Sequence, residues 1–62
     1  MKAILTIKMD NVAFEPDNGL ELAAILRHLA DSCEAREQLT PGDMFLARDF
    51  NGKSVGELRV KR

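Results

Sequence analysis

The stretch MFLARDFNGKSVGELRV, residues 44–60, decides the fold, because it predicts a β-hairpin to which every other element must be fitted. Its Asn51-Gly52 pair is typical of a two-residue turn between antiparallel strands. Such a turn places Phe50 opposite Lys53, and the strands on either side then pair residue by residue. The resulting pairs are Phe45–Leu58, Leu46–Glu57 and Ala47–Gly56.

A strand and a helix are predicted upstream of the hairpin. Residues 2–9 alternate apolar and polar side chains, which is the period of a strand with one apolar face. Residues 19–36 repeat apolar side chains at helical spacing, and Asn18 with Glu21 has the pattern of a capping box at the start. The apolar stripe of this helix consists of Leu22, Ile25, Leu26, Leu29 and Cys33.

The connector between the first strand and the helix, residues 10–18, is rich in turn-forming residues. We expect Phe14 to anchor this connector in the core, with a short extra strand near Val12–Glu15 as an alternative for its middle. A second turn precedes the hairpin, because Thr40-Pro41-Gly42-Asp43 has proline and glycine where a type II turn prefers them.

These elements predict an α+β fold of the two-layer β-α-β-β type, with one helix packed on a three-stranded sheet in a single domain over residues 1–62. The helical crossover makes the first two strands parallel in direction, so sheet order 1-2-3 would pair them directly. Order 1-3-2 makes every pair antiparallel, which better suits a short chain with one covered sheet face. We therefore favour order 1-3-2. Either order leaves two edges at which a second copy could pair.

The two faces of the predicted sheet differ in composition. The face that receives the helix combines Phe45, Ala47, Gly56, Leu58 and Val60 with Ala3, Leu5 and Ile7. The opposite face, which a single helix leaves uncovered, is basic and also carries several large apolar side chains. Exposed patches of this kind mark interfaces. Its candidate partner-binding residues are Ile4, Met44, Leu46, Arg48, Phe50, Lys53, Val55 and Arg59.

The sequence offers little for catalysis or cofactor binding. Cys33 is the only cysteine, and its place on the helix stripe predicts a packed core thiol rather than a nucleophile. His28 is the only histidine, lies beside the stripe and is expected at the surface. Glu15, Asp17 and Glu21 gather at the helix start, where capping and the helix dipole explain them. We therefore predict no catalytic residue, no metal site, no cofactor and no enzymatic activity.

Cysteine content, hydropathy and charge bear on the compartment and on the partner. A lone thiol is typical of a reducing cytosol, and no apolar run approaches the roughly 20 residues of a membrane span. The formal net charge is only −1, but residues 10–43 carry eight acidic and two basic side chains, whereas both ends of the chain are basic. We expect a cytoplasmic protein with no membrane partner, an acidic helix layer and a basic open sheet face.

Two kinds of partner fit the open sheet face. Its mixed apolar and basic character favours protein binding, either to a second copy as a homodimer or to a different protein. The alternative is a nucleic acid, whose backbone the basic side chains would follow. Single-stranded nucleic acids also require aromatic platforms, and Phe50 is the only aromatic residue predicted for this face. We therefore favour a non-enzymatic protein-interaction module and keep nucleic-acid binding as the alternative.

A set of short segments spread along most of the chain forms a recognisable pattern. These segments are KAILTIK at residues 2–8, Asp10-Asn11, Ala13-Phe14-Glu15, Glu21-Leu22-Ala23, Ile25-Leu26-Arg27, Leu29-Ala30, Arg48-Asp49, Asn51-Gly52 and Val55-Gly56. In them the chain resembles short β-α-β-β proteins encoded by phages and prophages. That family has no assigned activity, so no functional residue is carried over. The resemblance implies a cytosolic accessory protein, and such proteins often bind and modulate a host protein, including defence enzymes.

Overall fold

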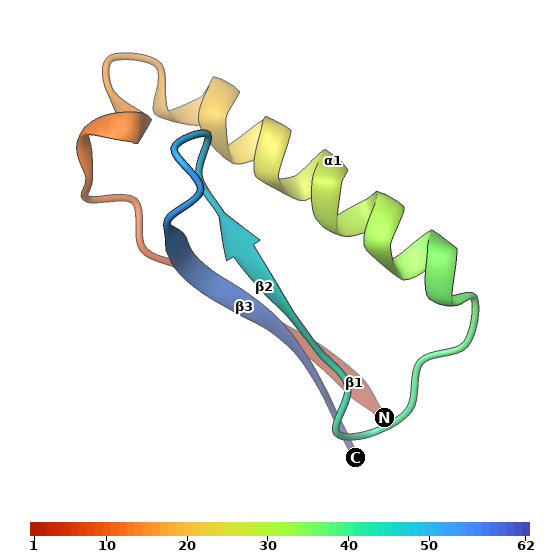
Figure 1. The fold of residues 1–62 in the computed structure, drawn as a ribbon. Coiled ribbons are helices and arrows are strands. Elements are labelled where there is room, and N and C mark those ends of the chain that lie inside the picture. Colours follow the sequence, from red (N-terminus) through yellow and green to blue (C-terminus); the bar gives the residue numbers. More distant parts are fainter.

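The computed structural model describes residues 1–62 and shows one α-helix lying on a three-stranded sheet (Figure 1). In chain order the elements are β1 (Lys2–Ile7), the 3₁₀-helix η1 (Val12–Phe14), α1 (Asn18–Arg36), β2 (Met44–Arg48) and β3 (Ser54–Lys61). The strands are arranged β1-β3-β2, and β3 pairs antiparallel with both neighbours. The predicted α+β fold with sheet order 1-3-2 is confirmed. The first strand ends two residues before the predicted boundary, and the helix begins one residue earlier than expected.

The loop between β2 and β3 is one residue longer than the predicted turn. The Gly52 N–H donates to the Asp49 carbonyl and the Asp49 N–H donates to the Lys53 carbonyl, both at 2.9 Å. Phe50, Asn51 and Gly52 therefore form the loop. Gly52 has a φ of 83°, the left-handed conformation that closes a three-residue hairpin loop and that glycine adopts without steric cost. Phe50 consequently does not face Lys53, and the predicted two-residue turn is wrong.

A β-bulge at Val55 absorbs the extra loop residue. Arg48 pairs with Ser54, but the preceding residue Ala47 pairs with Gly56, so Val55 has no partner of its own. The predicted pairing of Ala47 with Gly56 is therefore confirmed, as are the pairs beyond it. Val55 itself is 8% exposed and belongs to the core, whereas the sequence predicted it on the open face. That prediction is wrong, because the bulge interrupts the alternation of side chains along β3.

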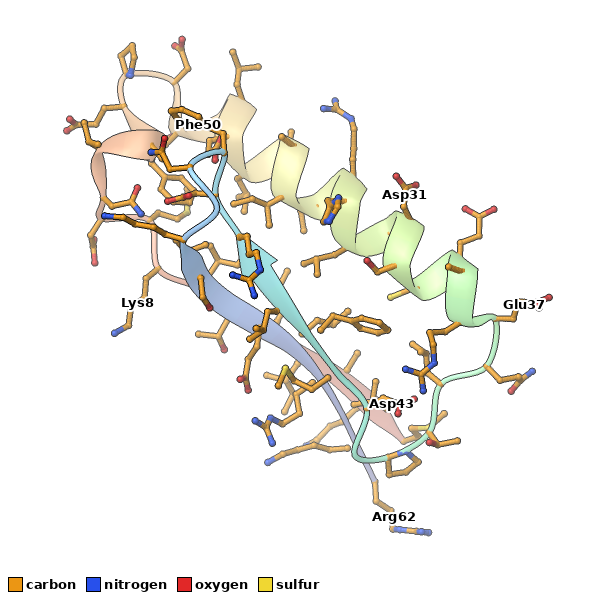
Figure 2. All side chains as sticks on the ribbon, viewed as in Figure 1. Lys8, Asp31, Glu37, Asp43, Phe50 and Arg62 are labelled. Carbon is orange, nitrogen blue, oxygen red and sulfur yellow. The ribbon has the colours of Figure 1, made fainter.

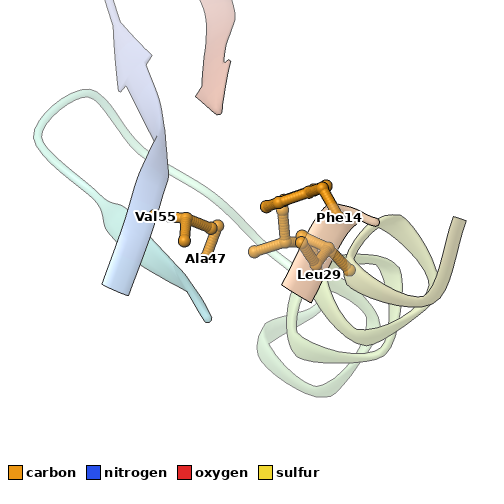
Figure 3. Close-up of a cluster of buried hydrophobic side chains, with 5 residues drawn as sticks. Phe14, Leu29, Ala47 and Val55 are labelled. Carbon is orange, nitrogen blue, oxygen red and sulfur yellow. The ribbon is translucent and has the colours of Figure 1, made fainter. Parts of the chain in front are cut away.

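The core lies between α1, η1 and the end of the hairpin that carries the loop (Figure 3). It consists of Phe14, Ile25, Leu29, Ala47 and Val55, with Ile7, Phe45 and Leu58 partly buried against it. Phe14 is thereby confirmed as the anchor of the connector. Its segment is a 3₁₀-helix rather than an extra strand, because the Asn11 side chain accepts a hydrogen bond from the Ala13 N–H at 2.8 Å and starts a turn.

The helix covers only part of its face of the sheet. α1 contacts η1 and β2, and Figure 1 shows it running along the β2 side of the sheet. A helix with its side chains is about 10–12 Å wide and strands lie about 4.8 Å apart, so a helix seated over one edge strand does not reach the other edge. Leu5 of β1, which the sequence placed beneath the helix, is therefore 41% exposed, and Leu26 of the stripe is exposed as well. The prediction that the helix covers β1 is wrong for Ala3 and Leu5, whereas Ile7 is partly buried against the core as expected.

The start of α1 differs from the predicted capping box. Asp17, rather than Asn18, occupies the N-cap position, and its side chain makes no capping hydrogen bond. The Glu21 carboxylate instead accepts a 2.8 Å hydrogen bond from the Phe50 N–H in the hairpin loop. This bond ties the loop to the first turn of the helix, where the helix dipole also favours a carboxylate.

Candidate functional site

The face of the sheet opposite α1 is uncovered and forms the candidate site. Side chains alternate along each strand, and the register places Ile4, Arg59 and Met44 in one row across the sheet. The next row consists of Thr6, Glu57 and Leu46. We call this surface the open face, and its residues are Lys2, Ile4, Thr6, Met44, Leu46, Arg48, Ser54, Glu57, Arg59 and Lys61.

Large apolar side chains line both flanks of the open face. Ile4 on β1 is 41% exposed, while Met44 and Leu46 on β2 are 42% and 44% exposed. Single exposed apolar residues are ordinary on protein surfaces, whereas several that share one surface mark a place where another molecule binds. Here the register sets all three around the central strand β3, so they form the apolar part of one continuous surface.

A close ion pair lies along the centre of the open face. Glu57 and Arg59 are two residues apart on β3, so both side chains point to this face. The Arg59 Nε lies 2.7 Å from the Glu57 Oε2. The hydrogen bond from Arg59 lowers the pKa of Glu57, and the same bond raises the pKa of Arg59. Glu57 is the only carboxylate of the open face, and it is already engaged.

The remaining charges of the open face are cationic. Lys2 and Lys61 pair across β1 and β3 at one end, and Arg48 lies on β2 near the other end. The Arg48 Nη1 donates to the Gly52 carbonyl at 3.2 Å, which holds the guanidinium beside the hairpin loop. With Arg59, the open face combines four cations with one carboxylate, and its electrostatic potential is therefore positive.

A shallow hollow of about 410 Å³ opens on this face near the bulge. The residues that line it are Thr6, Lys8, Leu46, Ser54, Val55, Gly56 and Glu57. Two of them, Ser54 and Gly56, are small, and the bulge draws the Val55 side chain toward the core, so little fills the space above the strand. Lys8 and Glu57 are its only charged residues, and it holds no histidine or cysteine.

Five of the predicted partner-binding residues come together on the open face, namely Ile4, Met44, Leu46, Arg48 and Arg59. Phe50 does not join them, because it lies at the tip of the hairpin loop beside the beginning of α1 (Figure 2). Lys53 lies between the loop and the beginning of β3, and Val55 is in the core. The three departures have one cause, since the longer loop and the bulge displace every residue between Arg48 and Gly56 from the predicted register.

Sequence reasoning missed Lys61, because the predicted hairpin ends at residue 60. In the structure β3 continues to Lys61, which faces Lys2 on β1 and adds a cation to the open face. The available signal is the alternation along this strand, since Glu57, Arg59 and Lys61 repeat charged side chains at every second position.

Asp49 is the second residue that sequence reasoning missed. It is 5% exposed, and its carboxylate accepts hydrogen bonds from the Asn11 side chain at 2.8 Å, the Asn51 N–H at 2.9 Å and the Lys53 N–H at 3.0 Å. Burial raises the pKa of Asp49, but the hydrogen bonds from Lys53, Asn11 and Asn51 together outweigh burial and lower it. An aspartate at the first position of a turn is the sequence signal for this role.

Reactive groups do not gather at the open face. Cys33 is half-buried on α1, and His28 is exposed on the same helix. No three His, Cys, Asp or Glu side chains are placed to hold a metal ion together. The structure has no helix with the length and apolar character needed to cross a membrane.

Comparison of the chain with protein-family models, curated proteins and solved structures found no match.

Proposed function

We propose that this chain is a non-enzymatic protein-interaction module that binds a partner protein through the open face. The observation that supports the proposal most is the exposure of Ile4, Met44 and Leu46 on one surface bordered by cations. Apolar groups surrounded by charged groups are the composition of protein interfaces that form between independently folded partners.

The proposed partner carries carboxylates around an apolar patch. Lys2, Arg48 and Lys61 border the open face and would meet those carboxylates. Leu46 and the hollow beside it would receive an apolar side chain of the partner. Attraction between opposite charges of this kind speeds association and makes binding sensitive to salt. The resemblance to phage-encoded accessory proteins favours a host protein, including a defence enzyme, as the partner.

Charge disfavours a second copy of the chain on the same surface. Two open faces stacked on each other would bring four cations of one copy against four of the other, with only Glu57 of each copy to offset them. Like charges that meet across an interface suppress binding. A homodimer through the open face, which the sequence predicts as one arrangement, is therefore less favoured than a complex with a different protein.

The test compares variants that place acidic side chains on two different surfaces. Met44→Asp/Leu46→Asp changes the open face, whereas Leu20→Asp changes a leucine of α1 that is 71% exposed. Each tagged protein would be used for quantitative affinity purification from host lysate, after circular dichroism confirms that it is folded. We expect the wild type and Leu20→Asp to enrich the same proteins, and the double variant to lose those whose capture also weakens at about 0.5 M salt. Equal capture by the folded double variant would contradict the proposal.

A nucleic acid is the second candidate partner, and the excess of cations on the open face supports it. Phosphate contacts from Arg48, Arg59 and Lys61 would carry the binding, because Phe50 lies away from this face and leaves no aromatic platform. Fluorescence anisotropy with labelled DNA and RNA at about 50 mM salt tests this candidate. Arg48→Gln/Lys61→Gln should then weaken binding several-fold and reduce its dependence on salt. An absence of binding at that salt concentration would remove the candidate.

A further inference from the structure

β1 has a free outer edge, and beyond Lys2 at its beginning it carries none of the features with which proteins protect such edges. The strand lies at one side of the β1-β3-β2 sheet and pairs only with β3. Its sequence KAILTI contains no proline, and its pairing with β3 is regular over all six residues. Its single charge, Lys2, lies at the beginning of the strand. Exposed edges of this type are templates for pairing with another strand.

The backbone groups at this edge can be assigned from the register. The Lys8 N–H donates to the Val55 carbonyl at 2.8 Å, so the backbone at Lys8 faces β3. Because backbone groups alternate in direction along an antiparallel strand, Thr6 and Ile4 also face β3. Ala3, Leu5 and Ile7 therefore direct their N–H and C=O groups outward, away from the sheet.

The side chains at the middle of β1 are apolar on both faces of the sheet. Leu5 points to the helix side, where α1 leaves it 41% exposed. Ile4 points to the open face and is also 41% exposed. β2, the other edge strand, differs because α1 packs against it (Figure 1). β1 is thus the edge at which backbone groups and apolar side chains are both without cover.

We propose that two copies of this chain pair antiparallel through β1, so that their sheets join into one sheet of six strands. An antiparallel pair related by a two-fold axis keeps the same face of both sheets on the same side, so both helices lie on one side and both open faces on the other. Met44, Leu46 and the hollow of the open face remain accessible on both copies.

The register follows from the outward backbone groups and from charge. Ala3 of one copy pairs with Leu5 of the second copy through two hydrogen bonds, and the two-fold axis repeats this pair. Ile4 then faces Ile4 of the second copy on the open side, and Lys2 faces Thr6 of the second copy. The alternative register centred on Leu5 would set Lys2 against Lys8 of the second copy, and like charges opposite each other destabilise a strand pair.

A second copy is the occupant that fits this edge best. Only eight of the 62 residues are buried, and domains of this size gain stability from a partner subunit. β1 complements itself, because its own Ala3 and Leu5 meet at the edge in an apolar pair. This inference does not rest on the proposed function, since it is argued from the backbone groups and apolar side chains at the edge of β1.

The first test compares two matched leucine variants. Leu5→Lys places a cation at the proposed seam, whereas Leu46→Lys makes the same change at a leucine of similar exposure, 44%, on β2. Light scattering should give twice the chain mass of 6.9 kDa for the wild type and for Leu46→Lys, and a single chain mass for Leu5→Lys. A wild type that stays monomeric at about 1 mM, or a folded Leu5→Lys dimer, would overturn the inference.

A cross-linking test covers the case in which Leu5→Lys does not fold. In a Cys33→Ser background, Ile4→Cys places two thiols opposite each other at a pair whose Cα atoms lie about 4.5 Å apart, within the range of disulfides. Mild oxidation should convert this variant to a covalent dimer, whereas Met44→Cys in the same background should remain a single chain. Cross-linking of Met44→Cys alone would show face-to-face stacking and overturn the inference.

The two sets of variants also separate this inference from the proposed function. Leu5→Lys should lose the dimer and keep the captured partner proteins. Leu46→Lys should keep the dimer and lose those proteins. The dimer and the partner binding are therefore tested by separate measurements, and a negative result for one does not contradict the other.

Discussion

The two ends of the sheet are held together in different ways. The loop end comprises η1, the start of α1 and residues 49–55. There the buried core lies beside hydrogen bonds that the carboxylates of Asp49 and Glu21 accept. At the terminal end, where β1 begins and β3 ends, Val60 is buried, and the exposed Arg36 side chain links the end of α1 to Asp43 and β2. Arg36 lies 3.0 Å from the Asp43 carboxylate and 5.9 Å from the centre of the Phe45 ring.

The difference between the two ends reflects how a very small domain distributes its apolar side chains. A chain of this length has too little apolar surface to fill a core along the whole sheet. The main buried cluster forms where α1, η1 and the hairpin meet, whereas Leu5, on the helix side farther along the sheet, remains exposed. The buried cluster and the proposed binding surface thus lie at different places, and single substitutions should affect one without the other.

The largest effect is expected where β1 joins β3 at the loop end. A Cβ at Gly56 would overlap the Thr6 carbonyl oxygen and lie 2.8 Å from the Ile7 Cα, and both are backbone atoms. Gly56→Ala should therefore lower the free energy of unfolding by about 3 kcal/mol. Gly19→Ala is the matched control, because nothing lies within 4 Å of its added Cβ. Equal urea midpoints for the two variants would contradict the close approach of the strands.

The next effect compares one leucine from each end. Leu29 is 4% exposed in the core, and Leu29→Ala should cost about 3 kcal/mol of unfolding free energy. Leu5 is 41% exposed, and Leu5→Ala should cost less than about 1 kcal/mol when measured at low protein concentration, where the chain is a monomer. Urea denaturation followed by circular dichroism measures both. A larger loss at Leu5 would mean that the terminal end carries the stability.

Acid should weaken the loop end by a smaller and graded amount. The pKa of Asp49 is lowered in the folded protein, whereas the unfolded chain has the ordinary aspartate pKa of about 3.9. The carboxylate therefore stabilises the fold fully above that ordinary value, and its contribution is lost as the pH falls through the lowered value. The urea midpoint should decline below about pH 4. Asp49→Asn should reduce the decline without abolishing it, because the pKa values of Asp43 and Glu57 are lowered too.

The smallest effect is expected from the ion pair at the terminal end. Arg36→Gln removes the contacts with Asp43 and Phe45, but exposed ion pairs contribute little because water and salt screen them. The urea midpoint should fall less than in Leu29→Ala, and the difference from wild type should shrink in about 1 M NaCl. A loss equal to that of Leu29→Ala would erase the contrast between the two ends.

The hairpin shows how far sequence patterns predict this fold. Asn51-Gly52 correctly locates the reversal of the chain, and the antiparallel sheet follows from it. The loop length was not predictable from the dipeptide, because a glycine with positive φ closes two-residue and three-residue loops alike. The choice is made by Asp49, whose carboxylate binds the N–H groups of Asn51 and Lys53 in the longer loop.

The open face was predictable where strand alternation is undisturbed. Ile4, Met44 and Leu46 lie outside the bulge, and their positions follow from a period of two residues. Phe50 and Val55 lie within the displaced segment, so the same rule fails for them. The exposure of Leu5 was not predictable, because helical periodicity indicates which side of α1 is apolar but not over which strands that side lies.

The bulge at Val55 also makes the tip of the molecule independent of the open face. The bulge in β3 compensates for the extra loop residue before Gly56. The strand pairs beyond Gly56, which set the positions of the open-face residues, therefore keep their register. Changes of loop length and sequence can therefore accumulate at the tip while the pattern of the open face stays constant. For protein engineering, this separation makes the tip a site for grafting foreign peptides, with the sheet as an invariant scaffold.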